Sequence, residues 1–550
     1  MEPTEDERSP DFSGMSWVRN MWGLEPRWTI IPDETAIMET VKSAVGLTEP
    51  CKIEFLAQGA FNKLYTIASS ETEVIARVTL PIDPKWKTLS EVATLDWVRE
   101  NTSLPVPRVL AYRADRSTPI GFEWIAMEKM PGKPWADVWQ TIPFSTKKEI
   151  VARIALFCSE TFEKQLCGIG NIFPASEGDV STRADQPETG TPLHAVPVQR
   201  IVNTAFITNG FQRNVPRGPF STAREWIQAR LDLAELDCRK RLSLVQPCQN
   251  STTTQDQTGD ATETNATETS GGGQHDGLVT GPDVAVSETS GVEGGPERRD
   301  EGSGKANQEE NDIGAGTKEK DVDEKDVEQN DGDEKEEDEK DKNTEDDDNE
   351  DDDNEDSDEA EDPEDLENAL LIISKLNNHL NNFFPPNPNP APEPSIIFHD
   401  DLNRHNLLLS STGVLTAVVD WECVSALPLF TACQYPPFLQ GKPNEIEPIK
   451  HIYQHDEHGQ VDEIYWEHLE YFELTQLRRF FLDEMRRLQP GWVEIFESRT
   501  SQRQRDFELA VAACDDPFML RRILKWLADM EESGVENVPG LEERIDNETL

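Results

Sequence analysis

A long segment of unusual composition, from about residue 247 to residue 362, divides the sequence into two parts. It is rich in Thr, Gly, Asp, Glu and Lys and has almost no aromatic residue. Such a segment cannot bury enough apolar surface to offset the entropy lost on ordering, so we expect a disordered acidic insertion. The folded residues resume on its far side, at about residue 363.

The insertion also explains much of the charge of the chain. Residues 297–367, which include most of its acidic residues, supply about half of the formal net charge of -55. Because a strongly acidic protein repels phosphate backbones and anionic lipid surfaces, nucleic acid and membranes are not expected as partners. Basic proteins are the partners that the insertion could recruit, although a solvated tether without a specific partner is the simpler interpretation.

The cysteines and the N-terminus indicate the compartment. The eight cysteines are scattered and form no C-x-x-C pair, which is typical of reduced thiols in an intracellular protein. Residues 1–7 are acidic and lack the apolar core of a signal peptide, and no later apolar run approaches about 18 residues. The sequence therefore predicts a soluble, cytoplasmic protein.

Residues 51–131 are predicted to form a small α+β lobe, preceded by an N-terminal extension at residues 1–50. A helical pattern lies at residues 89–99, and strand-like runs lie at residues 53–56, 64–68, 73–78, 109–112 and 122–127. A small antiparallel sheet of about five strands with one helix would end near Pro131 and Gly132.

The rest of the folded sequence is predicted to form a larger, mainly helical lobe in two parts, at residues 132–246 and 363–535. Helical patterns occur at residues 147–165, 221–236 and 365–380. Short apolar runs that suit small strands or a hairpin lie at residues 396–398, 406–409 and 414–419. Residues 536–550 are assigned to a C-terminal tail.

The residues with the clearest chemistry lie between residues 398 and 422. Asp401 precedes Asn406 by five positions, and Asp420 follows an apolar run that would hold it rigidly. Phosphoryl transfer needs a group that orients or deprotonates the acceptor hydroxyl, here Asp401, and oxygen ligands for Mg²⁺, here Asn406 and Asp420. His399 is predicted to brace the loop. A polar turn followed by a strand-end cap is the alternative, and it would leave the spacing to coincidence.

Weaker signals for nucleotide binding lie upstream. Gly59, between two predicted strands, could let backbone amides approach phosphate oxygens, although an ordinary hairpin turn also fits. Arg77 on the third strand would contact phosphate, and Glu91 on the next helix could pair with it. Glu128 and Met130, in the segment that joins the lobes, would present backbone groups to adenine; a simple linker is the alternative.

Together these residues resemble the aminoglycoside phosphotransferase and choline kinase-like superfamily. The resemblance is carried by His399, Asp401 and Asn406 and by residues 420–422, while residues 168–172 and 217–220 resemble its fungal branch. Asp400 stands where the family has glycine, and Arg77 where it has lysine. The resemblance implies a protein-kinase-like two-lobe fold, ATP and Mg²⁺ as cofactors, Asp401 as the catalytic carboxylate, and Asn406 and Asp420 as metal ligands.

Two functions follow from these observations. The first is an ATP-dependent kinase that phosphorylates a hydroxyl group of a small molecule. The alternative is a pseudokinase, a nucleotide-binding or scaffold protein whose acidic insertion recruits partners. The sparse glycine loop favours the alternative, whereas the retention of Asp401, Asn406 and Asp420 opposes it.

Overall fold

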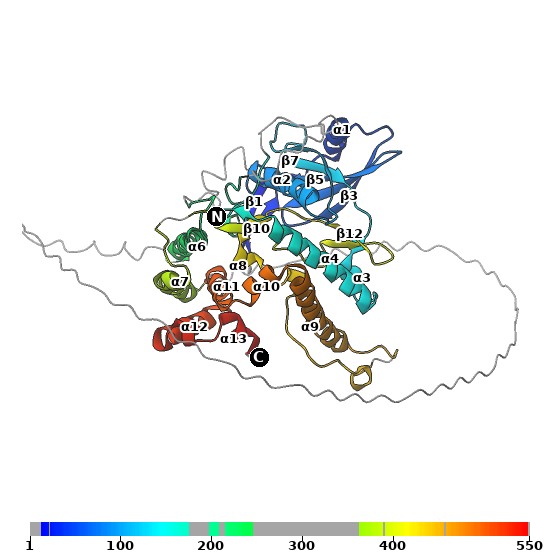
Figure 1. The fold of residues 1–550 in the computed structure, drawn as a ribbon. Coiled ribbons are helices and arrows are strands. Elements are labelled where there is room, and N and C mark those ends of the chain that lie inside the picture. The colour runs from blue at the N-terminus through cyan, green and yellow to red at the C-terminus, as the bar shows by residue number, and fades with distance from the viewer. Residues whose placement is uncertain are drawn as a thin grey trace, which may run out of the picture. The chain divides into compact units, whose positions relative to one another are not determined.

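The computed structural model describes residues 13–20, 23–174, 197–207, 215–245, 362–388, 391–455 and 458–547. These residues are drawn in colour in Figure 1. The predicted insertion lies outside the described residues, apart from Asp362, whose side chain caps the helix that follows. Within the described ranges, no helix combines the length and the apolar character needed to cross a lipid bilayer.

An antiparallel sheet of five strands forms the core of the first lobe, as predicted. Its strands are β3 (Lys52–Gln58), β4 (Asn62–Ala68), β5 (Glu73–Thr79), β6 (Val109–Arg113) and β7 (Glu123–Glu128), in the spatial order β3-β4-β5-β7-β6. The predicted helix is α2 (Trp86–Asn101), which contacts β6 and β7. Each of the five predicted strands is therefore present.

Alternate side chains of the central strand β5 face two different cores. Val74, Ala76 and Val78 pack in the cluster that includes helix α1 (Glu34–Val45), whereas Ile75 packs in the cluster that includes α2. Because side chains alternate along a strand, Arg77 shares the face of Ile75. The strand register therefore directs Arg77 toward α2 and the second lobe.

The segment assigned to an N-terminal extension contributes three elements. Strand β1 (Met15–Asn20) pairs antiparallel with β2 (Gly23–Trp28), and α1 follows. Asp33 caps α1 by accepting a hydrogen bond from the backbone nitrogen of Ala36 at 3.0 Å, and Gly46 ends the helix in the left-handed conformation. Ile37 and Val41 of α1 are buried against the sheet. Apolar burial thus ties α1 to the first lobe.

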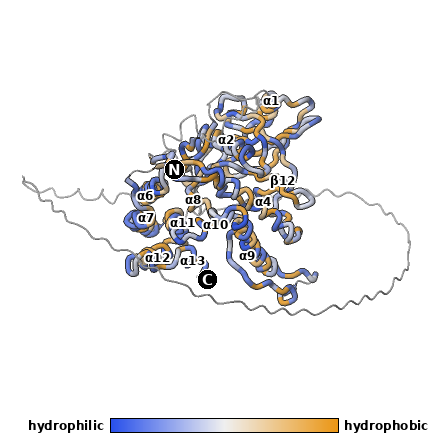
Figure 2. Tube along the Cα trace, in the orientation of Figure 1, coloured by the Kyte–Doolittle hydropathy of each residue, from blue (hydrophilic) through white to orange (hydrophobic). Residues whose placement is uncertain are grey.

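The second lobe is mainly helical, as predicted, and uses residues from both sides of the insertion. Its helices are α3 (Trp135–Val138), α4 (Phe144–Glu163), α5 (Thr204–Ile207), α6 (Ala223–Val245), α7 (Pro363–Phe383), α8 (Leu429–Ala432), α9 (Glu463–Leu488), α10 (Pro490–Glu497), α11 (Arg499–Ala512), α12 (Leu520–Ser533) and α13 (Leu541–Asn547). Helices α6 and α7, which flank the insertion in sequence, pack against each other. Hydrophobic and hydrophilic residues are interspersed along the helices of this lobe (Figure 2). Buried residues from both sides of the insertion pack together in one hydrophobic cluster.

Two small antiparallel sheets hold the loops that carry the predicted chemistry. In one sheet β10 (Pro394–Phe398) lies between β9 (Leu166–Cys167) and β13 (Ser425–Pro428). In the other, β11 (Leu407–Leu409) lies between β8 (Lys133–Pro134) and β12 (Leu415–Val418). The chain passes from the first sheet to the second between β10 and β11 and returns between β12 and β13. The two connecting loops contain Asp401 and Asp420.

One buried carboxylate in this lobe should make stability depend on pH. Asp506 of α11 accepts a hydrogen bond from the backbone nitrogen of Glu542 at 2.9 Å, at the start of α13. Burial raises the pKa of Asp506 to about 6, although this hydrogen bond opposes the shift. In the unfolded chain the same group has a pKa of about 3.9. Between these values the folded state holds a proton that the unfolded state has lost, so the contribution of Asp506 to stability falls as pH rises.

We therefore expect Asp506→Asn, which keeps the accepting oxygen, to gain stability relative to the unmodified chain by roughly 2 to 3 kcal/mol between pH 4 and pH 7. Denaturant unfolding at several pH values measures this difference. The exposed Asp483, replaced by Asn, is the matched control and should leave the pH profile unchanged. If the unfolding free energies of Asp506→Asn and the unmodified chain changed with pH in the same way, this would contradict the raised pKa of Asp506.

Candidate functional site

The loop between β10 and β11 fixes the carboxylate of Asp401 from both sides. Asn406 donates its Nδ2 hydrogens to Asp401 Oδ2 at 2.9 Å and to the carbonyl oxygen of Asp401 at 2.8 Å. Asn403 donates from Nδ2 to Asp401 Oδ1 at 2.7 Å. Because these bonds use the amide nitrogen of Asn406, its Oδ1 is the atom that could bind a cation. The Asp401 side chain is exposed and its orientation is defined.

The residue before Asp420 is hydrogen-bonded to Asn406. The backbone nitrogen of Val419 donates to the carbonyl oxygen of Asn406 at 2.9 Å, directly after the pairing of Leu407 with Val418. Asp420 itself has a φ of 65°, a left-handed conformation that is uncommon and costly for a residue other than glycine. The structure thus joins Asn406 to Asp401 through its side chain and to the residue before Asp420 through its backbone.

Arg77 of the first lobe reaches this group. Its Nη1 lies 2.8 Å from Glu91 Oε1, so the predicted pair between the strand and the helix is present. Its Nη2 lies 2.9 Å from Asp420 Oδ1 and 2.7 Å from Glu422 Oε2. Arg77 is buried, and it connects the sheet, helix α2 and the loop after β12.

Two further residues of this cluster were missed by the sequence analysis. Lys87 of α2 pairs with Glu422, and Asn62 of β4 donates from Nδ2 to Glu422 Oε2 at 2.8 Å. Lys87 also donates to Asn62 Oδ1 at 3.2 Å, where Thr79 donates as well at 2.7 Å. Lys87 lies four positions before Glu91, one helical turn away on the same face, and this spacing is the signal that could have identified it.

The charges of the cluster leave one carboxylate in excess. Burial alone would raise the pKa of Glu422, but Arg77 and Lys87 lower it to about 2, so Glu422 is ionised at neutral pH. Two cations then face the three carboxyl groups of Glu91, Asp420 and Glu422, and burial raises the pKa of Glu91 although Arg77 and Lys87 oppose the shift. Of these side chains, Asp420 is the most accessible, with 36% exposed against 14% for Glu422 and 1% for Glu91. Asp420 is therefore the carboxylate of this cluster that a cation from solvent could approach most easily.

The donor set around Asp420 fits Mg²⁺. Asn406 and Asp420 offer amide and carboxylate oxygens, which are the ligands that this hard cation prefers. Among the described residues, no group of three His, Cys, Asp or Glu side chains is placed to hold a metal ion. In Mg²⁺ sites of nucleotide-binding proteins, one or two protein ligands commonly act together with phosphates and water.

The predicted adenine and phosphate contacts are less defined. A Cβ added at Gly59 would meet no atom within 4 Å, so the turn leaves open space, and the backbone nitrogen of Gly59 donates to Asn62 at 2.9 Å. The side chain of Glu128 pairs with Arg108 at 3.0 Å, and Met130 is half-buried beyond the end of β7. The nucleotide-binding roles of Gly59, Glu128 and Met130 stay predictions.

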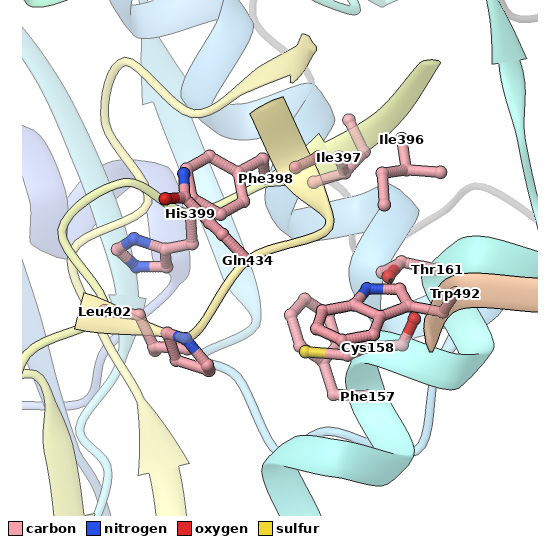
Figure 3. A pocket seen from close by; sticks show the side chains of 12 residues that line it. Phe157, Cys158, Thr161, Ile396, Ile397, Phe398, His399, Leu402, Gln434 and Trp492 are labelled. Carbon is pink, nitrogen blue, oxygen red and sulfur yellow. Dashed lines mark hydrogen bonds between the residues drawn. The ribbon is translucent and has the colours of Figure 1, made fainter. Parts of the chain in front are cut away.

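His399 is buried behind the loop. Its ring packs edge-on against Trp421, with 4.8 Å between the ring centroids, and burial lowers its pKa although Asp420 opposes the shift. Figure 3 shows His399 among the residues that line a small apolar cavity, together with Phe157, Cys158 and Trp492. That cavity measures about 20 Å³, which is too small for a substrate. The packing of His399 on Trp421 suits a bracing role.

Arg404, inside the Asp401–Asn406 spacer, anchors the loop to the helices. Its guanidinium carbon lies 4.4 Å from the ring centroid of Trp139, and its Nη2 lies 2.6 Å from Glu470 Oε1. Lys147 lies 4.0 Å from the same ring centroid and pairs with Glu473 at 2.6 Å. The Trp139 ring thus contacts two cationic side chains, and each of them pairs with a carboxylate of α9.

We expect Arg404→Gln to lower turnover roughly ten- to a hundredfold through loss of loop geometry, with little change in the KM for ATP. The loss of unfolding free energy should be roughly 1 to 2 kcal/mol. Steady-state kinetics and amide hydrogen exchange of the loop would measure both effects. Arg479 of α9 forms an exposed ion pair with Glu445, so Arg479→Gln is the control. A raised KM with unchanged turnover would contradict this role.

Comparisons with known proteins agree with these observations over part of the chain. Residues 320–430 match the model of the phosphotransferase enzyme family. A subtelomeric hrmA-associated cluster protein of Aspergillus fumigatus is 35% identical over 127 residues, which are 22% of this chain and 25% of that protein. The mitochondrial protein "altered inheritance of mitochondria protein 9" of Meyerozyma guilliermondii is 28% identical over 128 residues, 22% of this chain and 21% of its own length. The chain thus spans about a quarter or less of the curated relatives it matches.

Among solved structures, a thermostable mutant of the aminoglycoside phosphotransferase APH(4)-Ia, in complex with AMP-PNP and hygromycin B, is similar with a TM-score of 0.38. It is 10% identical, and the alignment covers 91% of this chain and 100% of that one. The family match includes Asp401, Asn406 and Asp420. The predicted resemblance to the aminoglycoside phosphotransferase superfamily is confirmed by this match, and the curated relatives are fungal proteins.

Proposed function

Because Asp401, Asn406 and Asp420 lie in a segment that matches the phosphotransferase enzyme family, we propose that the protein is an ATP-dependent small-molecule kinase. It would transfer the γ-phosphoryl group of ATP to a hydroxyl group of its acceptor. The observation that carries the proposal is that Asn406 is hydrogen-bonded to Asp401 and to the backbone of Val419, the residue before Asp420, which pairs with an arginine of the other lobe. ATP, Mg²⁺ and a small hydroxyl-bearing molecule are the partners that this function requires.

Each residue of the cluster has a role in this proposal. Asp401, held by Asn403 and Asn406, orients the acceptor hydroxyl or takes its proton. Asn406 and Asp420 would hold the magnesium ion of the bound nucleotide. The nucleotide would supply the phosphoryl group, and the ion would neutralise the negative charge that develops during transfer. Arg77 keeps a positive charge between the lobes, where family members carry lysine.

Hydrolysis of ATP with water as the acceptor tests this proposal. We expect slow, magnesium-dependent release of ADP that Asp401→Asn and Asp420→Ala each reduce strongly. Screening a metabolite library for accelerated ATP consumption then identifies the acceptor. Hydrolysis that persists at the same rate in both variants would remove the enzyme hypothesis.

A pseudokinase is the second candidate. The ion pair between Arg77 and Asp420 supports it, because the carboxylate proposed for the metal is already in contact with a cation. A pseudokinase would bind ATP without turnover, and the loss of Asp401 would then change nothing measurable. Recruitment of basic proteins by the insertion concerns residues outside the described ranges and stays a prediction. The cytoplasmic location also stays a prediction, since one relative is named as mitochondrial.

A further inference from the structure

A cavity of about 570 Å³ lies in the second lobe beside the loop of Asp401. Its wall is formed by residues of α5, α6, α8 and α11 and by Phe398 and Asp400 at the end of β10. Asp400 directly precedes Asp401. The volume is within the range of small-molecule sites, so the cavity is large enough for an acceptor next to the proposed catalytic carboxylate.

Three carboxylates in this wall already have an arginine partner. Glu508 Oε1 lies 2.7 Å from Arg230 Nη1. Arg241 Nη1 lies 3.1 Å from Asp237 Oδ2 and 2.6 Å from Asp515 Oδ2. Because each of these carboxylates already contacts an arginine, they attract a cationic group of a ligand less than an unpaired carboxylate does.

Asp400 differs from these three carboxylates. It is exposed to the cavity, and no Lys, Arg or His of the described ranges forms an ion pair with it. Neighbouring protein atoms displace water from the Asp400 carboxyl group, and this desolvation raises its pKa to about 6. The nearby charge of Asp401 adds to this shift, and a hydrogen bond with the Asn203 side chain opposes it. A cation placed beside Asp400 would stabilise its ionised form.

The cavity offers no comparable site for an anion. Arg505, which also lines it, donates from Nη1 to the carbonyl oxygens of Phe430 at 3.1 Å and Cys433 at 3.3 Å. Its Nη2 donates to the carbonyl oxygen of Phe496 at 2.8 Å. The donors of Arg505 are thus engaged with backbone, and those of Arg230 with Glu508 and the Trp226 ring.

Much of the remaining wall is apolar. Trp226, Leu233, Phe398, Leu427 and Leu509 contribute aromatic and aliphatic surface. An acceptor with an apolar body would gain free energy by covering this surface, at about 25 cal/mol per Å². A ligand with several charges would instead lose hydration without compensating ion pairs.

We propose that this cavity is the acceptor site of the kinase and that it takes a compact alcohol with an apolar body and a single positive charge, held by Asp400. The inference rests on the proposed function. In the reaction, the acceptor oxygen forms a bond to the γ-phosphorus while the bond from that phosphorus to the β–γ bridging oxygen breaks. The hydroxyl proton passes to Asp401 or to water, and ADP leaves with the bridging oxygen.

Direct binding to the full-length chain without nucleotide tests the site independently of catalysis. The probes are matched phenols that share one apolar body and one hydroxyl group, such as 4-(2-aminoethyl)phenol, 4-ethylphenol and 3-(4-hydroxyphenyl)propionate, with hygromycin B as a polycation. We expect calorimetric titration to give at least about tenfold tighter binding of the amine than of the neutral or carboxylate probe. Hygromycin B should bind no more tightly than the monoamine.

Asp400→Asn should abolish the preference for the amine and leave binding of the neutral probe unchanged. Ala512→Trp, at an exposed wall position of α11, should weaken all bound probes and leave magnesium-dependent ATP binding intact. The exposed control Asp483→Asn should change nothing. An absent amine preference, a preference that survives Asp400→Asn, or tighter binding of hygromycin B would overturn the proposal.

The two proposals can fail separately. If the rate of ATP hydrolysis is unchanged by substitution of Asp401 and Asp420 while amine binding depends on Asp400, the kinase proposal fails and the cavity is a binding site of another kind. If the library screen finds an accepted alcohol whose KM is unchanged in Asp400→Asn, the kinase proposal stands and the assignment of the cavity fails.

Discussion

Asp420→Ala should abolish magnesium-dependent nucleotide binding and lower turnover by a factor on the order of 10³. The side chain is the most accessible carboxylate of its cluster, and the residue before it is hydrogen-bonded to Asn406. Its removal takes away the excess negative charge that we expect to attract the metal ion. Titration of ATP with and without Mg²⁺, together with steady-state kinetics, measures both effects.

The same substitution should cost little stability. Without Asp420, Arg77 and Lys87 face Glu91 and Glu422, so the buried charges balance. The left-handed backbone at residue 420 is unfavourable for alanine as well as for aspartate, which limits any gain. Asp420→Asn is the matched variant of equal size. Full activity in either variant, with the fold intact, would contradict the proposed metal site.

The second large effect concerns Lys87, whose loss should cost about 3 to 5 kcal/mol of unfolding free energy. Lys87→Met keeps the apolar stem but leaves Glu422 with Arg77 as its single cation, a partner it shares with Glu91 and Asp420. Lys87 is 1% exposed, so water cannot replace the lost partner. Denaturant unfolding measures the loss.

A double-mutant cycle separates this ion pair from other effects of the substitution. Glu422→Gln in the Lys87→Met background should recover much of the stability, because the uncompensated carboxylate is removed. Lys85→Met, at the residue before α2, is a control for the loss of a lysine in the same region. Equal destabilisation by Lys87→Met with and without Glu422→Gln would show that the ion pair does not carry the effect.

The sequence predicted the elements whose pattern is local. The strands of the first lobe follow from short apolar runs separated by turn residues, and the spacing between Asp401 and Asn406 identified the loop. In that loop Asn406 is hydrogen-bonded to Asp401 and to the backbone of Val419, the residue before Asp420. The register of β5 also explains why Arg77 faces Glu91.

Contacts between distant parts of the sequence were not predictable in this way. Asn62 and Glu422 are separated by 360 positions, and no local pattern indicates their hydrogen bond. Lys87 was missed because a lysine on a helix is normally a surface residue. Arg404 and Trp139 belong to separate elements, and their stacking depends on how α3 and the loop pack. Such contacts follow from tertiary packing, which a single sequence does not encode locally.

Binding of Mn²⁺, which accepts the same oxygen ligands as Mg²⁺, tests the central claim most directly. Electron paramagnetic resonance distinguishes free from bound Mn²⁺ in the presence of AMP-PNP and the full-length chain. We predict one bound ion per chain in the unmodified protein, and loss of that binding in both Asn406→Ala and Asp420→Ala. Bound Mn²⁺ that is unchanged in the two variants would contradict the account.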